Sequence, residues 1–240
     1  MRMNRIETCC QNQKTGNFTP AKFLFTGREI LVEIRGSLHT FRGKFAFALF
    51  LAGIIVGFLP AAGGAENRRE LADRLMISLC FSNIGLIIMM SLQNHRLTYL
   101  LPVGRKEFAA MQIRKMAWVS MILLLIASAE FACADQRAEK FWWDIVAKAI
   151  PVSLGLSSCQ IATVQPIKGS ERNDGTKWPG CSIMVQSLDV GITFINLVST
   201  GGFWSIPASI LPALNYLISF LAIGYFYRKT ADASLYYDEL

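Results

Sequence analysis

The chain alternates between long apolar runs and short polar or charged segments. Each apolar run is close to twenty residues long, which is the length an α-helix needs to cross the hydrocarbon core of a bilayer. We therefore expect an all-α, polytopic membrane protein with six transmembrane helices. The predicted spans are residues 44–62, 75–93, 116–134, 145–167, 181–199 and 206–227.

The polar residues before the first span predict two different segments. Residues 1–25 are mixed in character and predict a flexible cytoplasmic tail. Thr26 and Glu29 have the spacing of a capping box, which predicts that a helix starts there. Apolar residues then recur at helical spacing, at Ile30, Leu31, Ile34, Leu38 and Phe41. We expect an amphipathic interfacial helix at residues 26–43 and a single transmembrane domain over residues 26–240.

Composition supports membrane insertion and disfavours nucleic acid as a partner. Hydrophobic residues make up 52% of the chain and charged residues 17%, whereas a typical soluble domain is about one quarter charged. The formal net charge is +7. The basic residues are dispersed among the spans without an aromatic-studded patch, so membrane lipid with anionic headgroups is the expected partner.

The distribution of Lys and Arg predicts the orientation of the chain. With both termini in the cytoplasm, most Lys and Arg residues near the spans lie on the cytoplasmic side, as the positive-inside rule requires. We expect this orientation in a bacterial cytoplasmic membrane. The basic residues predicted on the outer side are Arg68, Arg69, Arg74, Arg137, Lys140 and Lys148.

A basic break between the second and third predicted spans has a distinctive order of residues. It reads Leu101-Pro102-Val103-Gly104-Arg105-Lys106-Glu107-Phe108. Pro102 favours an extended conformation before it, Gly104 permits a tight turn, and helix formers follow. The order predicts a short surface helix that leads directly into the third span. An ordinary basic loop is the alternative reading.

This stretch resembles a signature of ABC transporter permeases of the type 2 exporter class, "LPV-small-R-K/R-E". Gly104 stands where that family more often has Ser. The matching residues are Leu101, Pro102, Val103, Arg105, Lys106 and Glu107. The resemblance implies the transmembrane subunit of an exporter, paired with the same or a similar permease as a homodimer or heterodimer. It also implies that residues 101–107 contact a separate ATPase subunit.

The chain contains no phosphate-binding motif of its own. A Walker A sequence needs Ser or Thr after Gly-Lys, but Gly43-Lys44 is followed by Phe45. We therefore expect no enzymatic activity and no cofactor in this chain, with ATP hydrolysis left to the partner.

Four polar residues inside predicted spans are candidates for the lining of a translocation path. Asp189 is the acidic residue deepest in a span, and Gln186 shares its helical face. Asn196 follows on the same helix, and Asn83 lies in the second span. A proton-sensitive gate and a purely structural interhelical hydrogen bond are both open readings of Asp189. We expect Glu130, at the outer end of the third span, to reach the interface.

The remaining chemistry is sparse. The six cysteines form no CxxC pair, neither Cys9 nor Cys10 has an assigned role, and no metal site is expected. Two other classes of function stay open, a membrane-anchored interaction or assembly protein without transport, and a small ion-coupled transporter that uses Asp189. The sequence does not identify the transported substrate.

Overall fold

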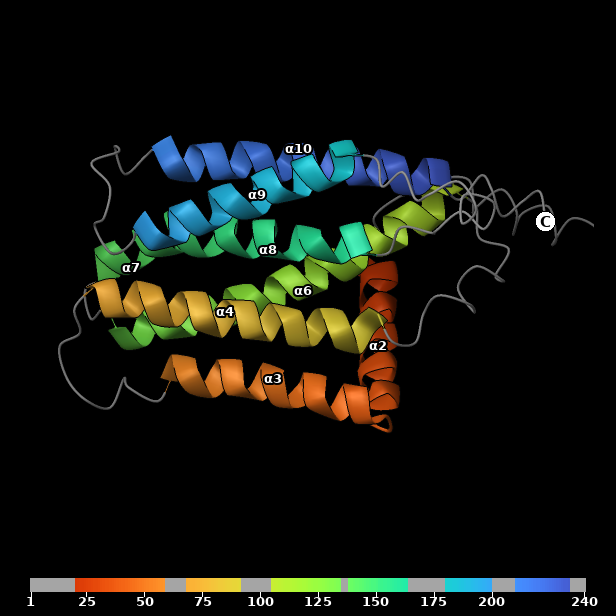
Figure 1. Ribbon diagram of the computed structural model, residues 1–240, viewed down its shortest axis with the longest axis horizontal. Coiled ribbons are helices and arrows are strands. Elements are labelled where there is room, and N and C mark those ends of the chain that lie inside the picture. Colours follow the sequence, from red (N-terminus) through yellow and green to blue (C-terminus); the bar gives the residue numbers. More distant parts are fainter. Residues whose placement is uncertain are drawn as a thin grey trace, which may run out of the picture.

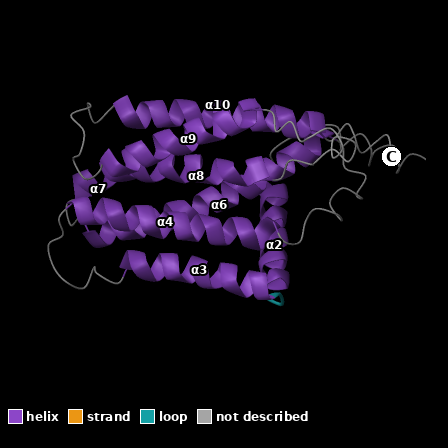
Figure 2. Cartoon of the chain, viewed as in Figure 1, coloured by secondary structure: helices purple, strands orange, loops and turns teal. Residues whose placement is uncertain are grey.

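The computed structural model describes residues 20–58, 68–91, 105–134, 138–163, 180–199 and 210–233, and the regular secondary structure there is entirely helical. The longer helices lie side by side in a bundle, and α2 (Pro20–Ser37) crosses one end of it (Figures 1 and 2). The bundle helices are α3 (Phe41–Phe58), α4 (Arg68–Ser91), α6 (Arg105–Ala134), α8 (Ile150–Thr163), α9 (Gly180–Val198) and α10 (Ile210–Ala233). The prediction of an all-α protein is confirmed for these residues.

Four of these helices are long and apolar enough to cross a membrane, which indicates an integral membrane protein. The apolar segments are Phe41–Phe58, Asp73–Met90, Ala109–Cys133 and Ile210–Arg228. The fourth and fifth predicted spans are also helical but shorter in apolar length. Helix α8 has 14 residues, and α9 contains the apolar stretch Met184–Val198.

The N-terminal helix differs from the prediction at both of its ends. Helix α2 runs from Pro20 to Ser37, so it begins inside the segment predicted as tail. Thr26 lies within the helix, and its prediction as an N-cap is wrong. The helix also ends before Phe41, which is the first residue of α3 rather than part of an interfacial helix.

A tight turn at residues 38–40 separates α2 from α3 and sets the angle between them. The Thr40 hydroxyl accepts a hydrogen bond from the Gly43 N–H at 3.0 Å, which caps the start of α3. A Cβ on Gly43 would lie 1.9 Å from the Ser37 carbonyl oxygen, so only glycine fits there. These contacts hold α2 across the end of the bundle, roughly perpendicular to α3 (Figure 1).

Two of the polar segments between the predicted spans, residues 63–74 and 135–144, contain helix. Helix α4 begins at Arg68, so part of the polar segment before the second span is helical. Helix α7 (Ala138–Asp144) occupies most of the mixed-charge segment after the third span. It continues into the π-helix η2 (Ile145–Ala149), which leads into α8. Charged residues extend these helices beyond the apolar runs, and an apolar pattern alone does not mark such ends.

Helices α3 and α4 approach each other closely along a series of small residues. A Cβ on Gly53 would lie 2.7 Å from the Ser78 carbonyl oxygen. A Cβ on Gly85 would lie 2.6 Å from the Ala46 carbonyl oxygen and 2.9 Å from the Phe50 nitrogen. Because glycine has no side chain, the two backbones can touch, and such close contact at small residues is typical of helices that associate in a membrane.

The largest apolar core lies where α3, α4, α6 and α8 meet, and it includes Leu79, Leu86, Val119, Leu123 and Val152. The outer faces of the helices are also apolar. Helix α10 exposes Leu217, Phe220 and Leu221, at 57%, 61% and 65% of their surfaces. Apolar residues on both the inner and outer faces are typical of helices surrounded by lipid.

Candidate functional site

The stretch that resembles the permease signature leads directly into a membrane helix. Residues 101–104 lie outside the described residues, and helix α6 begins at Arg105. The side chains of Arg105 and Lys106 are likewise not described. From there α6 continues for 30 residues to Ala134 without interruption. The prediction that a helix begins after Gly104 and continues into the third predicted span is confirmed, although the two form a single helix rather than a short helix followed by a span.

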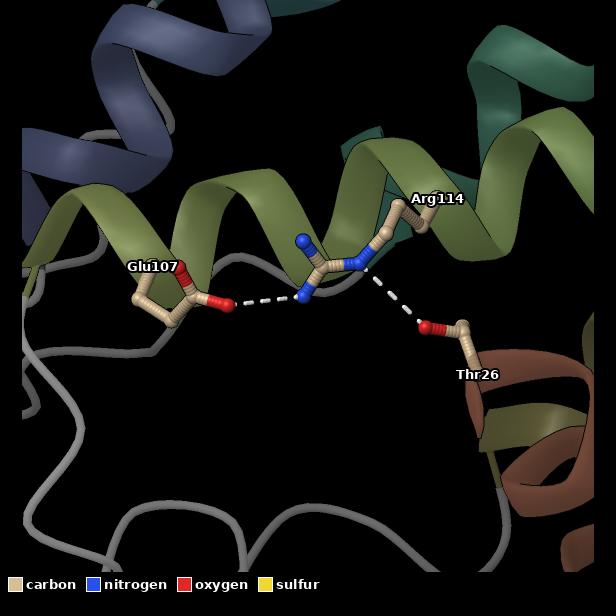
Figure 3. Close-up of polar contacts among 3 residues, drawn as sticks. All are labelled: Thr26, Glu107 and Arg114. Atoms are coloured by element: carbon tan, nitrogen blue, oxygen red, sulfur yellow. Dashed lines mark hydrogen bonds and ion pairs between the residues drawn. The ribbon is translucent and has the colours of Figure 1, made fainter. Parts of the chain in front are cut away.

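A group of polar side chains joins α2 to the first turns of α6, and we call it the α2–α6 junction. It consists of Thr26, Glu33, Glu107, Arg114 and Lys115. The Lys115 ammonium donates to Glu33 Oε1 at 2.5 Å. The Arg114 guanidinium lies between two partners (Figure 3). It donates to Glu107 Oε1 at 3.0 Å through Nη2 and to the Thr26 hydroxyl at 3.3 Å through Nε.

The charges of the α2–α6 junction are buried, so their pairing matters. Glu33, Arg114 and Lys115 are each at least nine-tenths buried. Moving such charges out of water costs several kcal/mol each, and the cost is offset only by close partners. Nearby, burial raises the pKa of Glu29, although Lys115 opposes the shift. The junction therefore fixes where α2 sits on α6, because any slip would leave a buried charge without its partner.

A second polar group lies in the middle of the bundle, between α8, α9 and α10, and we call it the Asp189 cluster. It consists of Ser158, Asp189, Thr193, Asn215 and Ser219, and all five are fully buried. The Ser158 and Ser219 hydroxyls contact the two carboxylate oxygens of Asp189 at 2.5 and 2.7 Å. Thr193 and Ser219 both contact Asn215 Oδ1, at 3.1 and 3.2 Å.

Asn196 compensates for a break that Pro151 makes in the backbone. Proline has no N–H, so it cannot donate to the carbonyl of Ala147 four residues earlier. The Asn196 amide donates to that carbonyl at 3.3 Å. Just before the proline, the Ile150 N–H donates to the carbonyl of Ile145, which lies five residues earlier rather than four. This bond makes the turn η2 π-helical.

The same turn places Lys148, which is predicted among the basic residues of the outer side, in the bundle interior, where it is 7% exposed. Its ammonium donates to the Asn196 carbonyl at 2.9 Å, to Asn196 Oδ1 at 3.1 Å and to the Ser199 hydroxyl. A cation at the last carbonyls of α9 is favourable because the C-terminus of a helix is negative. Lys148 and Asn196 therefore lock η2 to the end of α9.

The other predicted polar residues do not form one site with Asp189. Asn83 on α4 donates to the Leu156 carbonyl of α8 at 3.0 Å, which is an interhelical bond apart from the Asp189 cluster. Gln186 is half-buried on α9. Glu130 is 2% exposed and accepts a bond from Ser78 at 2.5 Å, so the expectation that it reaches the interface is wrong. It packs against Gly57 of α3, where a Cβ would lie 2.2 Å from Glu130 Oε1.

Sequence reasoning missed Glu33, Arg114 and Lys115 as a group, although one signal was present. Glu33 lies on the helical face of Ile30, Ile34 and Ser37, which is the face that α2 buries. A charge on the apolar face of an amphipathic helix calls for a buried partner. The partner itself, 82 residues further along the chain, could not be found by spacing.

The two polar groups suit different tasks. The α2–α6 junction makes a rigid unit of one helix across the bundle and one helix along it. The Asp189 cluster provides a carboxyl group surrounded by hydroxyls in the core. Among the described residues, no group of three or more His, Cys, Asp or Glu could hold a metal ion. Comparison of the chain with family models, curated proteins and solved structures found no match.

Proposed function

We propose that the chain is the transmembrane permease subunit of an ABC exporter of the type 2 class, driven by a separate ATPase subunit. The observation that carries the proposal is the continuity of α6 from Arg105, within the stretch that resembles the signature, to Ala134. This helix starts within the signature-like stretch and reaches the far end of the bundle as one rigid element. A partner that moves the start of α6 would therefore also move its membrane-embedded part.

In the proposal, helix α2 moves together with the start of α6. It lies across the bundle end near the start of α6 and is fixed to it by the Lys115–Glu33 pair. Its outer face exposes Leu31 and Val32, at 67% and 69%, which suits a helix lying in the membrane interface. We propose that α2 and the first turns of α6 move as one body at the cytoplasmic surface.

Six spans complete the proposed architecture, with η2 and α8 together as the fourth and α9 as the fifth. Helix α9 supports this assignment because its buried face carries Asp189, Thr193 and Asn196 while large apolar residues are exposed. Met184 and Leu188 are 72% and 60% exposed, whereas Asp189 on the opposite face is fully buried. Two such permeases, identical or similar, would form the translocation path between them.

The proposed coupling predicts the effect of reversing two charges. The double substitution Arg105→Glu and Lys106→Glu should reduce the amount of ATPase that co-purifies with the permease, and transport with it. The reason is that charge-assisted hydrogen bonds contribute roughly 1.5–3 kcal/mol each. Insertion into the membrane should be unchanged. The measurement is the ratio of ATPase to permease after mild-detergent purification, together with transport in vesicles.

The matched control reverses two charges of the segment predicted on the outer side, with Arg137→Glu and Lys140→Glu, and should leave ATPase binding unchanged. Gly104→Pro, which should stiffen the turn predicted before α6, should reduce transport more than binding. Normal ATPase binding and transport in the Arg105/Lys106 variant would contradict the proposal. A complete lack of any Walker-containing partner would favour a membrane-anchored interaction protein.

The orientation is tested separately by labelling. In a cysteine-free background, a cysteine at position 137 should react with a membrane-impermeant reagent added from outside. A cysteine at position 105 should react only after the membrane is permeabilised. The reversed pattern would place α2 and the signature-like stretch outside the cell, where no ATPase could reach them.

A further inference from the structure

The hydrogen atoms available in the Asp189 cluster are too few for its contacts. Five oxygen–oxygen contacts of 2.5–3.2 Å involve Ser158, Thr193 or Ser219 as donor, and each of these hydroxyls carries one hydrogen. Ser158 faces both Asp189 Oδ2 and the Gly155 carbonyl, at 2.5 and 2.8 Å. Ser219 faces both Asp189 Oδ1 and Asn215 Oδ1. With Asp189 ionised, two of the five contacts hold no hydrogen.

A proton on Asp189 and one amide rotation supply the missing hydrogens. The protonated carboxyl donates from Oδ2 to Ser158, and Ser158 is then free to donate to the Gly155 carbonyl. Asn215 Nδ2 has no partner, while its Oδ1 faces two hydroxyls. Exchanging the amide oxygen and nitrogen lets Asn215 donate to both Thr193 and Ser219. Ser219 then donates to Asp189 Oδ1, and every contact contains one hydrogen.

The charges around the cluster favour the same state. Among the described residues, Asp189 forms no ion pair, and the two serine hydroxyls are its hydrogen-bond partners. Lys148 is held at Asn196, seven residues further along α9, or about 10 Å by helical rise. On the helices packed against α9, Cys159 of α8 faces Asp189, and a thiol is neutral at pH 7 in its ordinary state. The charged residues of α4 and α10 are confined to the first two turns of α4 and the last two turns of α10. They are Arg68, Arg69, Glu70, Asp73, Arg74, Arg228, Lys229 and Asp232.

The groups of the cluster do not suit a divalent metal cation. Asp189 is its single carboxylate, and among the described residues no group of three or more His, Cys, Asp or Glu could hold a metal ion. Ca²⁺ usually takes six to eight oxygen ligands, several of them from carboxylates. The helices also pack tightly here, since a Cβ on Gly155 would lie 2.0 Å from Thr193 Oγ1. A proton is therefore the better match to this cluster.

We infer that the Asp189 cluster is a proton-binding site, in which Asp189 is a neutral carboxylic acid that donates to Ser158 while α8, α9 and α10 are packed. After that proton is released, Ser158 can donate to the buried carboxylate only by giving up its bond to the Gly155 carbonyl, so deprotonation weakens the packing of the three helices. The site thus links their packing to the binding of one proton. This inference does not depend on which partner drives transport.

The test is infrared spectroscopy of the purified full-length chain with isotopically labelled aspartate, at pH 7. A carboxylic acid band should be present in the wild type and absent in Asp189→Asn, with the other aspartates unchanged. Ser158→Ala should shift the band because it removes the acceptor of the acid proton. Ser187→Ala, on the exposed face of α9, should leave the carboxylic acid band unshifted. The Ser158 and Ser187 variants keep the test decisive if Asp189→Asn does not fold.

Thermal unfolding gives an independent readout. Folded protein holds a proton that the unfolded chain gives up at neutral pH, so the free energy of unfolding should fall as pH rises. Asp189→Asn should lose the part of that dependence that corresponds to one proton. Two results would overturn the inference. One is an ionised-carboxylate band that is present in the wild type and absent in Asp189→Asn. The other is stabilisation by Na⁺ of the wild type but not of Asp189→Asn.

Discussion

Replacing Gly85 by leucine should destabilise the bundle strongly, because the new side chain would fall where the backbones of α3 and α4 touch. A Cβ at this position would already lie 2.6 Å from the Ala46 carbonyl oxygen and 2.9 Å from the Phe50 nitrogen, and these are backbone atoms that cannot rotate away. Gly85→Leu should therefore force α3 away from α4, with a loss of stability of about 3 kcal/mol. The measurement is the thermal midpoint of the detergent-purified protein.

The bundle offers a close control for this substitution. A Cβ on Gly224 of α10 meets nothing within 4 Å, so Gly224→Leu adds the same side chain to a membrane helix without a clash. It should change the midpoint little, or raise it through better helix propensity. Equal losses for the two variants would show that the close approach of α3 and α4 does not determine stability.

At the end of the bundle that α2 crosses, removal of Lys115 should reduce stability the most. Lys115→Met leaves Glu33 buried without its cation, and breaking a buried pair in this way costs about 3–5 kcal/mol. The double variant Glu33→Leu with Lys115→Met removes both charges and should recover most of the loss. Thermal midpoints combined with hydrogen exchange of α2 would show whether the helix detaches.

The control for Lys115 is an exposed charge on the same helix as its partner. Arg35→Met on α2 should change stability by no more than roughly 0.5 kcal/mol, because Arg35 is exposed. If the double apolar variant is stable but binds ATPase poorly, the α2–α6 junction contributes to coupling beyond folding. If Lys115→Met behaves like Arg35→Met, the pair does not hold α2 in place.

The Asp189 cluster shows the limit of reading a motif along one helix. Asp189 could be identified from the sequence because a carboxyl group inside an apolar run is rare and costly. Its partners could not be identified, because Ser158 and Ser219 come from helices 31 and 30 residues away. Serines are common in membrane helices, and only their position across the bundle distinguishes these two.

The apolar runs by themselves determined that this protein is helical and built for a membrane. A run of about twenty apolar residues can satisfy its backbone in lipid only as a helix, so length and composition suffice. The start of α6 at Arg105 could also be predicted from the sequence, because Pro102 and Gly104 disfavour helix just before a run of helix formers.

Tertiary structure alone decided how the polar groups pair. The turn after Ser37 places α2 across the bundle and brings Glu33 to Lys115. Pro151 frees a carbonyl that Asn196 then binds, and the resulting π-turn draws Lys148 into the core. Glu130 is buried because Gly57 allows α3 to pack over it. Each outcome depends on atoms that are distant in sequence, and the free energy of burying a polar group depends on whether those atoms arrive within bonding distance.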